Sequence, residues 1–267
     1  MGRLFLLLTV VAAGLASTTA PAATGPELKI IFPEGLSARQ MADQAAGVRQ
    51  IAIRKYGVTP LLSGSTYAAA TRAAKAPASF RPLLKRRSVE GFLFPSTYFF
   101  EPSSTAASLV ARQIETFRQR WASIDLRAAK ARKRTPYDVL IIASLIEKET
   151  VAPSERALVA AVIYNRHERG MPLAIDASLR YGLGVQGTRP LKQSHLRSNT
   201  PYNTHRFKGL PPTPITNPGV ASMQAAAKPA NVDYLYYVRK PNSVRHFFTA
   251  DEQEFCANAL EYGYRGC

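Results

Sequence analysis

The stretch TPYDVLIIASLIEKET, residues 135–150, decides how the fold of this chain is predicted. Thr135 can cap a helix, Pro136 suits the first helical position, and Asp138 completes a capping box. After this start, all but one of the residues up to Ile146 are apolar, and they lie on all sides of a helix. A helix that is apolar all round is buried all round. The sequence therefore predicts a central helix enclosed by the rest of a domain.

Two acids stand at the charged end of this helix. Successive residues turn by about 100°, so Glu147 continues the apolar face of Leu140 and Ala143, while Glu149 points nearly the opposite way. The two therefore cannot form a close carboxylate pair. Burial would raise the pKa of Glu147, as a general acid near neutral pH requires. The alternative is a structural carboxylate at the helix end, paired with an arginine such as Arg156 or Arg166.

The flanking segments predict an α+β chain with few strands. The stretch ELKII predicts a short strand, and a turn separates it from a helix capped by Ser37. Residues 107–124 form an amphipathic pattern, and a second helix after Pro153 ends at Gly170. The C-terminal YLYYV and RHFFT segments predict paired strands. Between residues 171 and 220, Gly, Pro and Asn predict long loops.

Composition and the N-terminus restrict the function classes. The chain has 267 residues, 46% of them hydrophobic, and a net charge of +17. This hydrophobic content excludes wholesale disorder, and the charge favours anionic surroundings. Residues 1–23 carry one charge, Arg3, before an apolar run that predicts export. A cleaved signal peptide and an uncleaved membrane anchor both remain open. Because the bulk of the chain is expected outside the cytoplasm, nucleic acid is not an expected partner.

The cysteines and histidines predict no metal site. Cys256 and Cys267 are the two cysteines, close to the C-terminus. In an oxidising compartment they are expected to form one disulfide, and two unpaired thiols are the alternative. No histidine has metal-ligand spacing with either cysteine.

Residues that suit sugar binding follow the central helix. Aromatic rings pack on the apolar faces of sugars, and amides bond to their hydroxyl groups. The candidates are Asn165, Asp176, Tyr181, Tyr202, Asn203 and Asn217. Each has an ordinary alternative, because asparagines favour turns and a tyrosine can belong to the core.

At these residues the chain resembles the endolytic murein transglycosylases, the YceG-like proteins. The similarity begins with VEGFLFPSTY and ASLIEKET, and it continues with YNR and GMPLAIDASLRYGLG. TPYNTHRFKGLPPTPITNPG, AAAKPANVDYLYYV and HFF follow in the family's order. The resemblance covers Val89 to about Thr249. The family's further histidine after HFF is absent here.

The resemblance implies domains and site residues. It implies a small LysM-like domain at 27–85, shorter than usual, before a larger mixed α/β catalytic domain at 86–267. The first acid of EKET, Glu147, corresponds to the family's catalytic residue. The residues that match cleft-lining positions and are expected to bind substrate are Asp176, Tyr181, Tyr202 and Asn203; Asn217 is added from the sugar-site cluster.

The resemblance also implies an activity and a location. One glutamate protonates the glycosidic oxygen of nascent peptidoglycan, and the sugar's own C6 hydroxyl closes a 1,6-anhydro ring, so no metal or organic cofactor is expected. The implied location is the inner membrane, with a single span and the bulk of the chain facing the periplasm. Cell-wall synthesis enzymes are implied partners. A non-catalytic wall-binding scaffold and, more remotely, an exported DNA-binding protein are the competing hypotheses.

Overall fold

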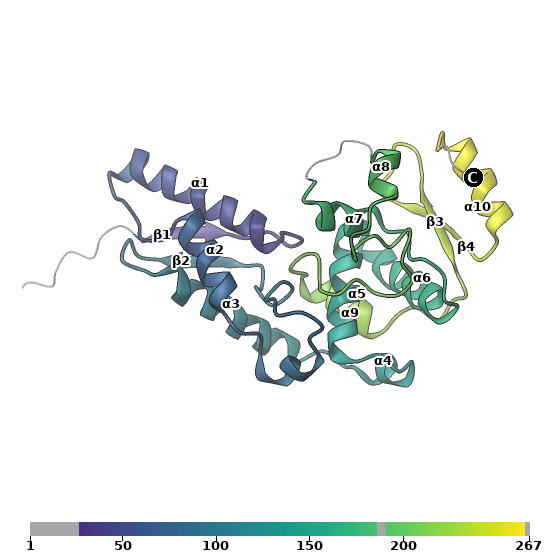
Figure 1. Cartoon of the computed structure of the whole chain (residues 1–267), viewed down its shortest axis with the longest axis horizontal. Helices are drawn as coiled ribbons and strands as arrows, with labels where there is room; N and C mark the ends of the chain where they lie inside the picture. Colours follow the sequence, from purple (N-terminus) through teal and green to yellow (C-terminus); the bar gives the residue numbers. More distant parts are fainter. Residues whose placement is uncertain (1–26, 186–190, 265–267) are drawn as a thin grey trace, which may run out of the picture.

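The computed structural model describes residues 27–185 and 191–264, which form two adjacent halves (Figure 1). Each half has its own hydrophobic core. The expected signal peptide or anchor at 1–23 lies outside the described residues. Among the helices at 27–185 and 191–264, none is long and apolar enough to cross a membrane.

The first half packs three helices on a two-stranded sheet. Strand β1 pairs antiparallel with β2, with Leu28 opposite Phe100. Ser37 caps α1 as predicted, because its side chain accepts from the Gln40 backbone and the Gln40 side chain accepts in return. The elements are β1 (Leu28–Ile31), α1 (Ala38–Tyr56), α2 (Gly64–Ala73), η1 (Ala78–Leu83), β2 (Thr97–Phe100) and α3 (Ala106–Trp121).

The first core extends past the expected domain boundary at residue 85. Strand β2 and the start of α3 pack with β1 and α1, while Phe80 of η1 belongs to the second core. The VEGFLF stretch is shared: Val89 and Leu93 enter the first core, and Phe92 and Phe94 enter the second. The division follows packing contacts between distant segments, which local composition does not reveal.

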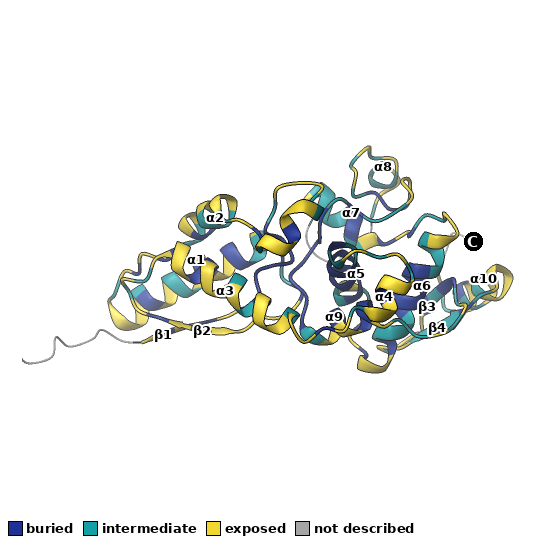
Figure 2. Ribbon diagram, turned by 90° about the horizontal axis from the view of Figure 1, so that it is seen from below, coloured by how far each residue is buried: buried dark blue, intermediate teal, exposed yellow. Residues whose placement is uncertain are grey.

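The second half surrounds α5. The Thr135–Asp138 capping box is present, and Val139 to Ile146 are all buried. Helices α6, α7 and α9 pack against α5, and Figure 2 shows it dark blue inside this half. The predicted central helix is therefore confirmed. The elements are α4 (Arg127–Ala131), α5 (Pro136–Glu149), η2 (Pro153–Glu155), α6 (Arg156–Glu168), α7 (Asp176–Leu183), α8 (Gln193–Leu196), α9 (Val220–Ala227), β3 (Tyr236–Arg239), β4 (His246–Thr249) and α10 (Glu252–Glu261).

The prediction of long loops between 171 and 220 is only partly correct. This region holds α7 and α8, and α9 starts at its end. Helix α9 consists mainly of small residues, and its Ala225, Ala226 and Ala227 are buried. A short helix of small residues has little periodic contrast, so its pattern does not distinguish it from a loop.

The C-terminal strand pair is confirmed. Strands β3 and β4 are antiparallel, with Tyr237 opposite Phe248, and α10 packs against both. Cys256 in α10 is disulfide-bonded; the other cysteine of the sequence, Cys267, lies outside the described residues.

Candidate active site

Three acids at the end of α5 and just beyond it point to three different partners. A Glu147 carboxylate oxygen accepts from the Gly219 backbone N–H at 2.9 Å. Glu149 accepts from the Tyr237 hydroxyl at 2.7 Å. Glu155 is the last residue of η2, is buried, and accepts from the His246 backbone N–H at 3.0 Å. The opposite orientations predicted for the two helix acids are thus seen in their partners.

Glu147 lies at the N-terminus of α9. Gly219 is the N-cap residue of α9, and because glycine has no side chain it cannot cap the helix itself. Helix N-termini favour a negatively charged partner, so the half-buried Glu147 carboxylate serves there as a cap. Glu147 therefore has a structural role, and it lies on the side of α5 that faces the first half.

Glu34 contacts the same glycine. A Cβ built on Gly219 would lie 1.7 Å from a Glu34 carboxylate oxygen, so a larger residue here would displace the end of the Glu34 side chain. Burial is the main cause that raises the pKa of Glu34; the charge of Glu147 adds to it and that of Arg156 opposes it. Arg156, the expected partner of Glu147, thus acts on Glu34, and the ion pairs among the described residues do not include it.

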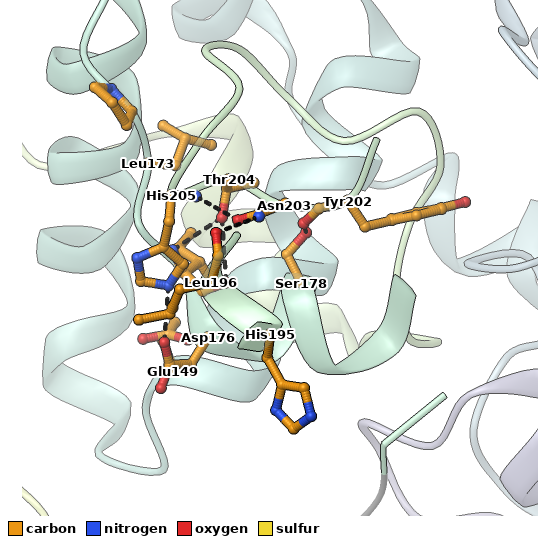
Figure 3. Close-up of polar contacts among 12 residues, drawn as sticks. Glu149, Leu173, Asp176, Ser178, His195, Leu196, Tyr202, Asn203, Thr204 and His205 are labelled. Carbon is orange, nitrogen blue, oxygen red and sulfur yellow. Dashed lines mark hydrogen bonds and ion pairs between the residues drawn. The ribbon is translucent and has the colours of Figure 1, made fainter. Parts of the chain in front are cut away.

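Glu149 lies on the other side of α5, toward β3. Its side chain is half-buried, and this burial is the main cause that raises its pKa above the ordinary value. The Tyr237 hydrogen bond lowers the pKa, the charge of Asp176 raises it, and His205 lowers it. The structure therefore gives Glu149 the protonation behaviour that the sequence analysis expected of Glu147. Figure 3 shows the side chain together with Asp176 and His205.

Asp176 and His205 are joined by a hydrogen bond beside Glu149. Asp176 is exposed at the first position of α7, and its carboxylate lies 2.8 Å from His205 Nε2. The residues just before Asp176 are fixed to the segment that carries His205, because Ala174 N–H donates to the Thr204 carbonyl at 2.9 Å. Ala174 has φ of 55°, a strained conformation for a residue with a side chain. This strain lies two residues from an exposed carboxylate.

Asn203 holds the loop that presents His205. Its side chain is fully buried, and its amide N–H groups donate to the carbonyls of Leu196 and Ser198 at 2.8 and 2.9 Å. Its side-chain oxygen accepts from the His205 backbone N–H at 3.3 Å. All three of these hydrogen bonds are made to the loop, so Asn203 supports the site, and its expected role in substrate binding stays a prediction (Figure 3).

Tyr181 and Tyr202 stand together at a cavity. Their rings lie 5.0 Å apart, edge to face. The Tyr181 hydroxyl donates to Glu90 at 3.1 Å, and the Tyr202 hydroxyl is 2.8 Å from that of Thr213. Both line a cavity of about 760 Å³ between the two halves. Because their hydroxyl groups already have partners in the protein, the expected role in substrate binding would fall to their aromatic rings.

Asn217 joins the two halves and is not exposed to a cleft. Its side-chain oxygen accepts from the Gly91 and Leu93 backbone N–H groups, each at 2.9 Å. Its amide donates to the Leu36 carbonyl at 3.0 Å and to Glu90 at 2.9 Å. The side chain is fully buried. The expectation that Asn217 binds substrate is therefore corrected: every polar atom of its side chain is used by the fold.

Glu90 is the buried acid at this junction. It is 4% exposed and accepts hydrogen bonds from Ala38, Tyr181 and Asn217. Burial raises its pKa to about 7, although these three hydrogen bonds favour the charged form. Near neutral pH its carboxyl is therefore partly protonated.

Glu90 predicts a pH dependence of stability. Its folded pKa is raised from about 4.5 to about 7, so the folded state holds more protons than the unfolded state between those values. The free energy of unfolding therefore falls as pH rises through this window. Relative to Glu90→Gln, the wild type should lose about 2–3 kcal/mol between pH 5 and 8. Urea unfolding of both proteins at the two pH values tests this, and parallel pH dependences would contradict it.

The site thus brings together only some of the expected residues. Asp176 lies near Glu149, and Tyr181 and Tyr202 line the cavity, while Asn203 and Asn217 belong to the framework. Asn165, weighed in the same cluster, donates from its side chain to the Val232 and Tyr234 carbonyls. Sequence reasoning missed Glu90, His205 and Tyr237. A single acid inside an aromatic run was the available signal for Glu90; no local pattern pointed to Tyr237.

The sequence matches the YceG-like family over residues 10–261, and the chain belongs to this family. A YceG-like protein of Listeria monocytogenes has a similar crystal structure, with a TM-score of 0.72 and 26% identity. The match covers 87% of this chain and 76% of that one. The structural similarity therefore extends over both halves.

Relatives with a similar sequence carry the name endolytic murein transglycosylase. The protein from Bacillus subtilis is 35% identical over 154 residues, which are 58% of this chain and 42% of that relative. The protein from Streptococcus pneumoniae strain R6 is 29% identical over 181 residues, which are 66% of this chain and 33% of the relative. The chain thus spans less than half the length of either relative.

Proposed function

We propose that this protein is a lytic transglycosylase that cuts peptidoglycan strands internally at the bond between N-acetylmuramic acid and N-acetylglucosamine. The names of its relatives support the substrate and the reaction class. The observation that carries the proposal is the half-buried Glu149, whose raised pKa suits a proton donor and which faces the exposed carboxylate of Asp176.

The proposed acid is Glu149, and Glu147 stays the prediction from the sequence. Both lie at the end of the same helix, on opposite sides of it. Glu149 has the raised pKa, whereas Glu147 is engaged by the N-terminus of α9. A general acid must be protonated before it reacts, and this requirement favours Glu149.

In the proposed reaction, the Glu149 carboxyl donates its proton to the glycosidic oxygen, and the bond from C1 to that oxygen breaks. The C6 hydroxyl oxygen of the same muramic sugar bonds to C1, and its proton passes to the Glu149 carboxylate. The acid is regenerated, no water is consumed, and the product is a 1,6-anhydro end. Two-carboxylate glycosidases instead need a second acid to activate water or form a covalent intermediate.

The other parts of the site have proposed roles in positioning. Tyr237 orients Glu149 by its hydrogen bond, and the role proposed for Asp176, which is hydrogen-bonded to His205, is to bind sugar hydroxyl groups. Holding the sugar in a reactive geometry supplies a large part of such rate enhancements. We propose a LysM-like glycan-binding role for the first half and attachment to the inner membrane through residues 1–23. Contact with cell-wall synthesis enzymes is part of the same proposal.

Mass spectrometry of a peptidoglycan digest tests the activity. Purified uncrosslinked glycan strands incubated with the protein should yield fragments one water lighter than hydrolysis products. Internal cutting should give long fragments before short ones. Strands that bind the protein and stay intact would favour the wall-binding scaffold, and fragments with the mass of hydrolysis products would exclude the anhydro mechanism.

A further inference from the structure

The cavity between the two halves has a wall that the proposed reaction does not use. At about 760 Å³ it falls in the size range of ligand sites, roughly 300–1,000 Å³. The start of α1 and the end of α2 line it from the first half, and α7 and the end of α5 from the second. Residues from both halves are therefore needed to form it.

Basic residues outnumber acidic ones among the described residues that line this cavity. They come from separate elements and are Arg39, Arg72, Arg87, Lys148 and Arg180. The ion pairs among the described residues include none of Arg39, Arg72 or Arg87, although all three are exposed enough to reach a ligand. Lys148 donates only a long hydrogen bond, 3.4 Å, to the Gly35 carbonyl.

One acid lines the described part of the cavity, and it cannot balance these charges. Glu90 is buried and already accepts from three protein groups. Its pKa of about 7 leaves it partly neutral at neutral pH. A concave site lined by one sign of charge raises the local concentration of the opposite ion, and arginine pairs with carboxylate or phosphate in two-point contacts.

We propose that this cavity binds an anionic oxygen group of the substrate, namely the carboxylates of the peptide stems carried by the glycan. The identity of the substrate rests on the proposed function. Helix α7 connects the two places, because its Asp176 lies beside Glu149 while its Ala177 and Arg180 line the cavity. A stem attached to the sugar at the reacting bond would enter the cavity while that bond lies at Glu149. The phosphates of a lipid-linked strand offer similar chemistry from another source.

Matched double variants test the cavity through activity. Arg39→Gln with Arg87→Gln removes two charges from the wall. The control is Arg54→Gln with Arg86→Gln. Arg54 is on α1 like Arg39, and Arg86 is next to Arg87, but both are exposed and neither lines the cavity. For strands with intact stems, the cavity variant should raise KM about tenfold or more, with kcat unchanged. For strands stripped of stems by an amidase, both variants should match the wild type. An equal change in KM on both substrates, or none, would overturn the proposal.

Binding to the full chain separates this proposal from the proposed function. Calorimetry with soluble N-acetylmuramoyl pentapeptide needs no cleavage. Binding that the cavity variant loses and the Arg54/Arg86 variant keeps would support the proposal even for a protein that cuts nothing. Binding of inorganic pyrophosphate without binding of the peptide would assign the cavity to phosphate and overturn the peptide assignment. Binding of neither probe would overturn the site itself.

Discussion

The Glu149→Gln variant should form anhydro products at least about 100-fold more slowly than the wild type, because general acid catalysis contributes roughly 10²–10⁴-fold. Glutamine has nearly the same shape and can still accept the Tyr237 hydrogen bond, but it cannot donate the proton. Release of anhydro fragments from uncrosslinked strands, followed by mass spectrometry, measures the rate.

Glu147→Gln is the matched control for this experiment. It changes the other acid of the same helix and leaves a side chain that can accept from the Gly219 N–H. It should retain most of the activity if Glu149 is the acid. The reverse pattern, with activity lost in Glu147→Gln and kept in Glu149→Gln, would return the role to the residue predicted from the sequence.

The pH profile gives an independent check on the same acid. Activity should fall as pH rises through the raised pKa of Glu149, because the proton is then lost. The Tyr237 hydrogen bond lowers that pKa, so Tyr237→Phe should move this limb of the profile to higher pH. A profile that keeps its position in Tyr237→Phe would contradict the assignment, whatever happens to the maximal rate.

The Asn217→Ala variant should lower the free energy of unfolding by about 4 kcal/mol or more, since each buried polar group left unpaired costs roughly 1–3 kcal/mol. It leaves the Gly91 and Leu93 N–H groups without their acceptor, whereas the Leu36 carbonyl still accepts from the backbone N–H of residue 217. It also removes one of the donors to Glu90. Urea unfolding at pH 7 measures the change.

An exposed asparagine provides the control for this stability effect. Asn231 is exposed, and its replacement by alanine should change stability by no more than about 0.5 kcal/mol. A loss below about 1 kcal/mol in Asn217→Ala would show that the junction relaxes around the missing amide.

The sequence predicted correctly those helices that begin with a capping residue. The capping box at Thr135 and the cap at Ser37 were legible because each depends on residues three positions apart. The C-terminal strands were legible from their aromatic and β-branched residues. Helix α9 was not, because its boundary is set by a carboxylate 72 positions away in sequence.

The site was harder to predict for the same reason. Helical periodicity correctly separated Glu147 from Glu149, but the neighbours that set their environments come from distant segments. The burial of Glu149 depends on Tyr237, and the strand that carries Tyr237 is 88 positions away. Asn203 and Asn217 have the composition of binding residues, and only the three-dimensional contacts show that backbone groups occupy their side chains.

The β1–β2 sheet also has a consequence for the order of folding. Leu28 pairs with Phe100, and the Leu36 carbonyl accepts a hydrogen bond from the Asn217 side chain, 181 positions later in the chain. Contacts of such high sequence separation form slowly, because a long loop must close before they are gained. The first residues of the folded part to be synthesised are thus among the last to be completed. A chain synthesised only as far as residue 216 has no Asn217 amide for the Leu36 carbonyl, so the contacts that join its two halves stay incomplete until this residue follows.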